Sequence, residues 1–203
     1  MKSNRQLSLN LGRPRSRQSE AAPAHVDALY FAILPDPEIA ARSLKLAGDL
    51  RRQYGFATKP RRADLSHITL YEIGSFHGLP EEAAFAAMQA ASTVRMRSFQ
   101  AVFDRAVSFG GGDNRPLVLW NRDGNAEMKA LCQELDEAMQ FTGFARQRGR
   151  TIEPHMTLLY RGHLIPEVML DTPITWTVRD FVLINSLQGL SRHDHLGYWL
   201  LPD

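Results

Sequence analysis

The sequence predicts an α+β fold with two lobes, in which two mainly antiparallel sheets surround a central cleft and the helices lie on the outside. Strand-like segments follow one another with few helices between them, which is typical of antiparallel sheets. A strand, helix, strand order also occurs twice. Matching residues in the two occurrences are separated by a constant 88 positions, which indicates an internal duplication.

The first unit begins with an apolar run at 28–34 that ends at Pro35, as expected of a buried strand. Asp36 then provides a helix cap, and the apolar face of the following helix continues until Gly55. A second strand is predicted at 66–73.

The second unit repeats this order with a strand at 117–120, a helix at 125–142 that Gly143 ends, and a strand at 152–160. The other predicted elements are a helix at 81–92 and strands at 98–107, 175–185 and 196–201. The pairs that share the offset of 88 residues are Gly55 and Gly143, Phe56 and Phe144, Arg62 and Arg150, His67 and His155, Thr69 and Thr157, Leu70 and Leu158, and Gly74 and Gly162.

Residues 1–25 contain five Lys or Arg residues against one Glu, so we expect a disordered basic tail ahead of a single bilobal domain at 26–203. That domain carries 19 basic and 21 acidic residues, a formal net charge of −2, which argues against a general nucleic-acid binder. Neither a membrane-spanning apolar stretch nor a secretory signal occurs, so we expect a cytoplasmic protein without a membrane partner. The single Cys132 lies among apolar residues at helical spacing, which favours a core position.

Each unit carries a His-x-Thr-Leu motif in its second strand. Because side chains alternate along a strand, His67 and Thr69 point to one face of their strand, and His155 and Thr157 do the same in theirs. A lone histidine in a strand is more often structural, but the duplication favours a functional pair. Each lobe therefore presents one imidazole and one hydroxyl to the cleft.

This pattern suits the cleavage of a phosphoester, which requires one group to remove a proton from the attacking oxygen and another to protonate the leaving oxygen. An unperturbed pKa of about 6.5 allows one histidine to be neutral while the other is charged. Threonine hydroxyls can donate hydrogen bonds to phosphoryl oxygens. We therefore expect His67 and His155 to be the base and the acid, in either order, and Thr69 and Thr157 to bind phosphate.

With these two motifs the chain resembles the 2H phosphoesterase superfamily, and in particular its LigT-like branch of 2′-5′ RNA ligases and RNA 2′,3′-cyclic phosphodiesterases. The resemblance covers residues 28–202 and includes, beside the motifs, the segments 31–35, 99–109, 115–120 and 181–186 with Tyr198. It implies a bilobal fold with pseudo-twofold symmetry, a central cleft and no metal or other cofactor. It also implies a catalytic and phosphate-binding set of His67, Thr69, His155 and Thr157.

One position departs from that branch. Its members often have an arginine two residues after the leucine of the second motif, where this chain has Tyr160. Arg161 follows one residue later, and a regular strand would place its side chain on the same face as His155 and Thr157. We therefore expect Arg161 to contact phosphate as well.

Three other features have simpler interpretations. The segment 110–114 lacks the Gly-Lys-Ser/Thr sequence of a P-loop and fits a hairpin loop. The segment His193-Asp194-His195 suggests a metal site, but a third distant ligand is not evident, so a polar turn is preferred. Basic residues precede both motifs, and their matching placement suggests that they rim the cleft. These are Arg51, Arg52, Lys59, Arg61 and Arg62 before the first motif, and Arg146, Arg148 and Arg150 before the second.

The leading hypothesis is a metal-independent enzyme that opens a 2′,3′-cyclic phosphate at an RNA or nucleotide end to give a 2′-phosphate, with reversible 2′-5′ ligation as a candidate side activity. Two alternatives stay open. The same site would act on a cyclic phosphate of ADP-ribose or on 2′-5′ oligonucleotides, or the cleft would bind RNA ends without turnover. We expect RNA or a nucleotide as the partner, no cofactor, and a monomer.

Overall fold

The computed structural model describes residues 26–110, 115–122, 125–145 and 152–203. The tail at 1–25 lies outside these ranges, as do residues 111–114 of the predicted hairpin loop and Arg146, Arg148 and Arg150. No helix in the described ranges is both long and apolar enough to cross a membrane.

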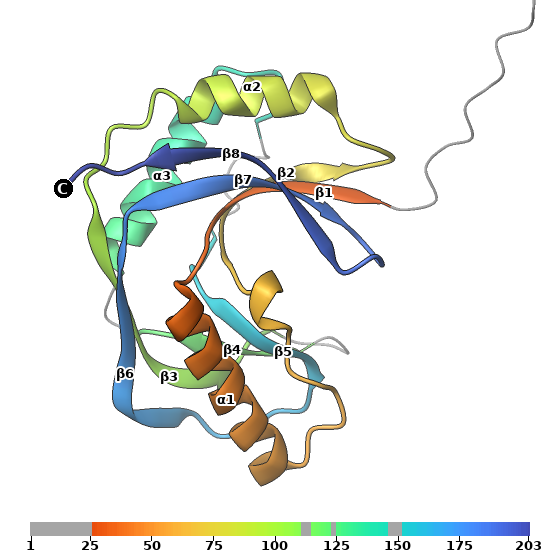
Figure 1. Ribbon diagram of the computed structural model, residues 1–203, viewed down its shortest axis with the longest axis vertical. Helices are drawn as coiled ribbons and strands as arrows, with labels where there is room; N and C mark the ends of the chain where they lie inside the picture. The colour runs from red at the N-terminus through yellow and green to blue at the C-terminus, as the bar shows by residue number, and fades with distance from the viewer. Residues whose placement is uncertain (1–25, 111–114, 123–124, 146–151) are drawn as a thin grey trace, which may run out of the picture.

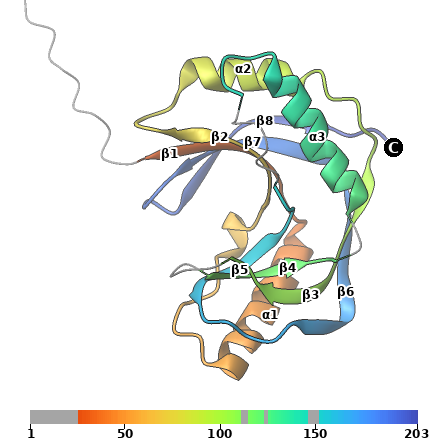
Figure 2. The ribbon, with the colours of Figure 1, turned by 180° about the vertical axis from the view of Figure 1, so that it is seen from behind.

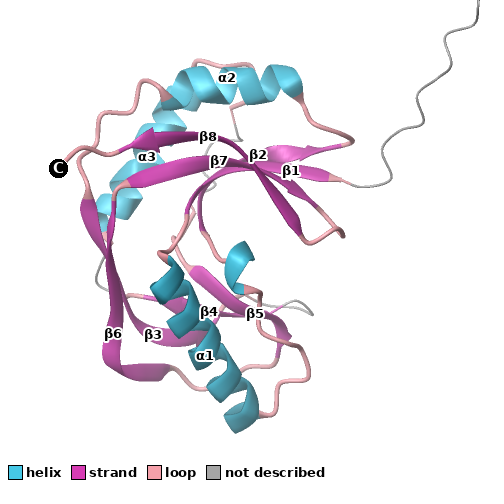
Figure 3. Cartoon of the chain, in the orientation of Figure 1, coloured by secondary structure: helices cyan, strands magenta, loops and turns pink. Residues whose placement is uncertain are grey.

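The described chain forms eight strands, three α-helices and one short 3-10 helix (Figure 3). The strands are β1 (Asp27–Ile33), β2 (Ile68–Phe76), β3 (Phe99–Ser108), β4 (Arg115–Trp120), β5 (Met156–Gly162), β6 (Val168–Val178), β7 (Asp180–Leu187) and β8 (Arg192–Leu200). The helices are α1 (Pro37–Tyr54), α2 (Glu81–Ala91), α3 (Ala126–Gln140) and the 3-10 helix η1 (Ala63–Leu65).

The first helix shows how local sequence sets these limits. Pro37 occupies the start of α1, where its missing N–H leaves no hydrogen bond unmade. Gly55 follows the last helical residue with a φ of 69°, a left-handed conformation that favours glycine. The limits of α1 agree with the prediction, but the side chain of Asp36 does not form the expected capping hydrogen bond.

The eight strands form one sheet in the order β6-β3-β4-β5-β2-β1-β7-β8, and every neighbouring pair is antiparallel. The prediction of two sheets is therefore wrong. Two four-stranded halves meet between β2 and β5, where the described residues contribute a single paired position, Ile68 with Met156. The two motif strands thus pair with each other, and this long-range contact leaves no trace in the periodicity of either strand.

The helices are exchanged between the two halves of the sheet (Figures 1 and 2). Helix α1, from the first unit, packs against β5 and β6, whereas α3, from the second unit, packs against β2 and β3. Helix α2 packs against α3 and β8. Helix α1 therefore packs on the half of the sheet that holds the strands of the second unit, whereas α3 contacts both halves through β2 and β3.

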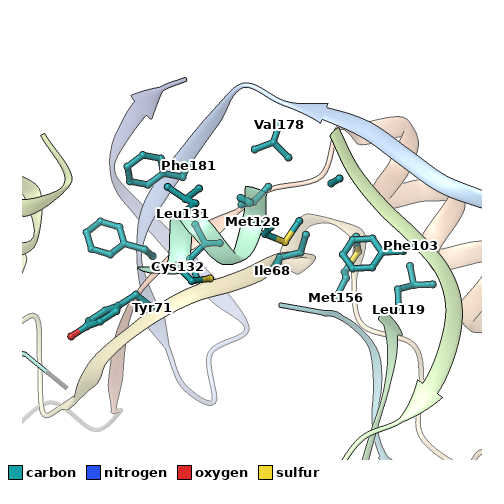
Figure 4. Close-up of a cluster of buried hydrophobic side chains, with 14 of the residues drawn as sticks. Ile68, Tyr71, Phe103, Leu119, Met128, Leu131, Cys132, Met156, Val178 and Phe181 are labelled. Carbon is teal, nitrogen blue, oxygen red and sulfur yellow. The ribbon is translucent and has the colours of Figure 1, made fainter. Parts of the chain in front are cut away.

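Apolar side chains from both halves merge into one buried cluster around the junction of β2 and β5 (Figure 4). Ile68 and Met156 belong to it, with exposed fractions of 0% and 1%. Cys132 of α3 is buried in the same cluster, which confirms its predicted core position. Burying one such side chain stabilises a fold by about 1.5–3 kcal/mol. Side-chain packing therefore stabilises the junction of β2 and β5, where the described residues contribute one paired position.

The C-terminal strands differ from the prediction in their limits. A single strand is predicted over 175–185, but the chain divides at Arg179 into the end of β6 and the start of β7. The segment 193–195, for which a polar turn is predicted, lies inside β8. The chain reverses just before it, where Gly189 and Ser191 have φ values of 83° and 50°. The side chains of 193–195 therefore project from an edge strand.

Candidate functional site

The two motif histidines immediately precede the paired residues Ile68 and Met156 at the starts of β2 and β5. Because Ile68 and Met156 point into the core, the residues on either side of them project from the opposite face. The pairing is antiparallel, so each histidine lies across from the threonine of the other motif. The half-buried side chains that share this face are His67, Thr69, His155 and Thr157.

Both motif imidazoles are held by the same hydrogen bond. Nδ1 of His67 lies 2.9 Å from the carbonyl oxygen of Leu65, and Nδ1 of His155 lies 2.8 Å from the carbonyl oxygen of Glu153. A carbonyl only accepts, so Nδ1 carries the proton in both rings. Nε2 of each ring is therefore the atom that can take up or give up a proton.

An aromatic ring lies beside each of these imidazoles. The Tyr30 ring centre is 5.1 Å from that of His67, and the Phe109 ring centre is 5.0 Å from that of His155. Phe109 also packs edge-on against Trp120. The duplicated histidines thus have similar apolar neighbours as well as similar hydrogen bonds.

Both motif strands are irregular one residue after the threonine. Leu70 is the extra residue of β2 relative to β1, and Leu158, 88 residues later, is the extra residue of β5 relative to β4. Each of these leucines and the residue after it are buried, so the alternation of side chains reverses beyond the bulge. As a result Glu72 and Tyr160 line the same cleft as His67.

The bulge bears directly on Arg161, because the predicted phosphate contact requires an uninterrupted strand. Tyr160 takes a position in the wall of the cleft instead. The side chain of Arg161 lies outside the described part of the structure. Its contact with phosphate therefore stays a prediction.

A cleft of about 1370 Å³ opens beside His67, between β1, β2, the β7–β8 hairpin and the loop that precedes β2. His67 and Thr69 line it, whereas His155 and Thr157 are not among its lining residues. Thr157 borders a separate small recess together with Arg61, which lines both spaces. Arg61 thus connects the cleft at the first motif with the second motif.

A third histidine, His193 of β8, lies in the same cleft. Its ring centre is 5.2 Å from that of His67, and its Nε2 lies 3.3 Å from the Tyr30 hydroxyl and 3.4 Å from Nη2 of Arg61. Among the residues that the structure describes, no group of three or more side chains could hold a metal ion. The sequence predicts a polar turn at His193 and places Tyr30 in an apolar strand, so it predicts neither residue as part of the site.

Burial and charge act on the titratable groups of this cluster. Burial is the main cause that lowers the pKa of His67 to about 3, and the positive charge of Arg61 adds to it, while the hydrogen bond to Leu65 opposes the shift. Burial and Arg61 also lower the pKa of His193 to about 4. Burial raises the pKa of Tyr30 to about 12. At neutral pH, His67 is therefore in its neutral form, with Nε2 unprotonated.

The basic residues before the first motif have different surroundings. Arg61 lines the cleft. Arg51, in the last turn of α1, instead donates a hydrogen bond of 3.0 Å to the carbonyl oxygen of Thr58. Arg62 is bound to the carboxylate of Asp64 on the surface, at 2.9 Å from its Nε. Of this run, Arg61 is therefore the residue that can meet a ligand in the cleft.

Comparison with known proteins gives a family for most of the chain. A family model described as the 2′-5′ RNA ligase superfamily matches residues 35–190. A search of curated protein sequences finds no significant match.

Comparison with solved structures gives the same fold. Apo E. coli LigT is 23% identical with a TM-score of 0.68, and the match covers 89% of this chain and 100% of LigT. E. coli LigT complexed with 3′-AMP is 23% identical with a TM-score of 0.69, covering 88% of this chain and 99% of that one. TT0787 of Thermus thermophilus is 21% identical with a TM-score of 0.67, covering 86% of this chain and 97% of that one. At these identities the likeness concerns the α+β fold with one large antiparallel sheet.

Proposed function

The chain belongs to the 2′-5′ RNA ligase superfamily, the 2H phosphoesterases that its motifs resemble, and from this we propose that it hydrolyses a 2′,3′-cyclic phosphate at an RNA or nucleotide end to a 2′-phosphomonoester. Reversible 2′-5′ ligation is the side activity of the same site. One observation carries the proposal: two imidazoles with identical Nδ1 hydrogen bonds project with two threonines from one face of the sheet. A duplicated acid and base suits a reaction in which one proton is taken and another is given.

In the proposed reaction His67 is the general base and His155 the general acid. Nε2 of His67, unprotonated because burial and Arg61 lower its pKa, removes a proton from water. The water oxygen bonds to phosphorus, the bond from phosphorus to the 3′ oxygen breaks, and His155 protonates that oxygen. The product keeps its phosphate on the 2′ oxygen, and exchange with solvent returns both histidines to their starting states.

Thr69 and Thr157 are proposed to donate hydrogen bonds to the non-bridging oxygens of this phosphate, where negative charge grows in the transition state. Their place beside the histidine of the opposite motif supports this role. A contact from Arg161 belongs to the same proposal. The solved complexes of E. coli LigT with 3′-AMP and with ATP support nucleotides as the ligand class.

The deciding experiment is digestion of a dinucleotide that ends in a 2′,3′-cyclic phosphate, followed by phosphorus NMR against authentic 2′- and 3′-phosphate standards. A single 2′-monoester is expected from the wild type, with almost no product from His155→Ala. His77→Gln, a change at an exposed histidine outside the cleft, is the matched control and should behave as the wild type.

The other results would replace the proposal. A 3′-phosphate product would reject the branch-level assignment, and an even mixture would reject a single bound pose. Turnover restricted to ADP-ribose cyclic phosphate or to 2′-5′ oligonucleotides would change the substrate. Tight binding of the cyclic end without any turnover would identify an RNA-end binding protein.

A further inference from the structure

Arg61 lies on a loop that is hydrogen-bonded to the second motif strand, β5. Its backbone N–H donates to the carbonyl oxygen of Leu158 at 2.9 Å, and the Thr58 hydroxyl donates to the carbonyl oxygen of Tyr160 at 2.6 Å. These bonds connect the loop before β2 to the bulged part of β5. The position of the Arg61 side chain is therefore set from both motif strands.

Among the described residues, the guanidinium of Arg61 has three polar partners, and each is electrically neutral. Its Nε lies 2.9 Å from the carbonyl oxygen of Leu65, the same oxygen that accepts from Nδ1 of His67. Its Nη1 lies 3.3 Å from the hydroxyl of Tyr160, and its Nη2 lies 3.4 Å from Nε2 of His193. A guanidinium has five N–H donors, so these contacts leave donors on both terminal nitrogens.

The positive charge of Arg61 is not neutralised within the described part of the chain, where it forms no ion pair with a carboxylate. Arg192 lines the same cleft but is bound to Asp194 at 2.7 Å. A half-buried cation whose hydrogen-bond partners are neutral attracts an anion. The charge lies beside His67, where the proposed reaction develops negative charge on phosphorus oxygens.

His193 is the hydrogen-bond partner of Nη2 of Arg61. Its Nε2 contacts the Tyr30 hydroxyl and Nη2 of Arg61. Because a guanidinium only donates, Nε2 of His193 accepts and is unprotonated, and the Tyr30 hydroxyl is then a donor to the same nitrogen. Tyr30 in turn has a side-chain hydrogen bond with Ser186. Nδ1 of His193 is buried and has no hydrogen-bond partner among the described residues. A cationic or an apolar residue at 193 would remove the acceptor that Arg61 uses.

We propose that Arg61 binds a non-bridging oxygen of the phosphate on which His67 acts, and that His193 is a positioning residue that orients Arg61 through its neutral Nε2. This inference rests on the proposed function, to which it adds the group that neutralises the phosphate. It also assigns a role to a histidine outside the two motifs. The ligand is the phosphate of a cyclic nucleotide end, or inorganic phosphate as its simplest probe.

The test is steady-state kinetics on the cyclic-phosphate dinucleotide with variants at Arg61. Arg61→Gln should lower kcat/KM by about 100-fold, as expected when a charge-stabilising donor is lost. Arg61→Lys should recover part of this loss, because it keeps the charge but not the fork of donors. Arg62→Gln is the matched control, since Arg62 is paired with Asp64 on the surface, and it should stay within about twofold of the wild type.

The role of His193 is tested by a double-mutant cycle with Arg61. His193→Leu should lower kcat/KM by about tenfold, whereas His193→Gln, whose amide oxygen can accept the same bonds, should stay within about threefold. In the Arg61→Gln background, His193→Leu should have no further effect. A full additional loss in that background would overturn the positioning role.

Calorimetric titration with inorganic phosphate separates this inference from the proposed reaction. Arg61→Gln should weaken phosphate binding by about tenfold, because a charge-assisted hydrogen bond is lost. If the wild type turns over no cyclic phosphate but still binds phosphate through Arg61, the proposed function fails and this site stands. If a folded Arg61→Gln variant matches the wild type in both kinetics and phosphate binding, the site is rejected. Should that variant fail to fold, Arg61→Lys carries the same comparison.

Discussion

Acidification should destabilise this protein through His67, and the size of the effect follows from its surroundings. An unfolded chain exposes this histidine, with an ordinary pKa of about 6.5. In the folded protein, burial and the charge of Arg61 lower the pKa to about 3. Between these two values the unfolded chain binds a proton that the folded protein does not, so protons favour unfolding.

The magnitude can be worked from these two pKa values. Well above pH 6.5 the histidine is neutral in both states and has no effect on stability. At pH 5 it lowers the free energy of unfolding by about 2 kcal/mol, and the loss would level off near 5 kcal/mol below pH 3. For a domain of this size, about 2 kcal/mol corresponds to a fall in Tm of about 4–8 °C.

The assay is thermal unfolding at pH 8 and pH 5, followed by calorimetry, for the wild type and for His67→Gln. Other groups also titrate in this range, so the informative quantity is the difference between the two proteins in their fall in Tm. That fall should be about 4–8 °C smaller in His67→Gln. His77→Gln, a change at an exposed histidine, should fall as the wild type does. An equal fall in all three proteins would refute the reasoning that His67 is buried in its neutral form.

Four further predictions concern the reaction and the fold. Replacing His67 or His155 by Ala should lower kcat by a factor of about 10² to 10⁴ in a protein that still unfolds cooperatively, and near-normal turnover would remove that residue from the mechanism. Thr69→Val and Thr157→Val should each lower kcat/KM by about tenfold, less than the histidine changes, and unchanged kinetics in both would make the hydroxyls structural. Turnover should survive exhaustive treatment with EDTA, and loss that added metal reverses would contradict the acid–base proposal. Gly48 lies inside α1, and a methyl group added there would meet Nη1 of Arg52 at 3.7 Å, an ordinary contact. Gly48→Ala should therefore raise the free energy of unfolding by about 1 kcal/mol through its higher helix propensity. A lower Tm than that of the wild type would contradict this prediction.

The sequence predicts the local structure well where one strong signal acts over a short distance. Helix α1 lies between Asp36 and Gly55 as predicted, and the runs predicted at 28–34 and 98–107 appear as β1 and β3 close to their expected limits. The offset of 88 residues extends beyond the motifs to structure, because the bulges at Leu70 and Leu158 and the Nδ1 hydrogen bonds both recur. Duplicated sequence thus produces duplicated backbone geometry.

The parts that the sequence does not reveal depend on contacts between distant segments. The union of two half-sheets rests on the pairing of Ile68 with Met156, and neither strand contains a signal for its neighbour. The bulge at Leu158 interrupts the alternation on which the argument for Arg161 depends, although each residue alone fits a regular strand. His193 lies in the cleft because β8 pairs with β7. The polar sequence after Gly189 predicts a turn there and gives no signal for this strand.

The duplication alone would give two equivalent histidines, and an acid–base reaction requires two different ones. The features that the repeats share, the Nδ1 hydrogen bond and the neighbouring aromatic ring, act similarly on His67 and His155. The features that distinguish them come from residues that the duplication does not repeat. The position 88 residues after Arg61 is Gly149, and His193 lies after the second unit. Burial is the main cause that lowers the pKa of His67, and the positive charge of Arg61 adds to it. In the proposed reaction, the duplicated frame would set the geometry, and the unrepeated Arg61 would favour His67 as the base.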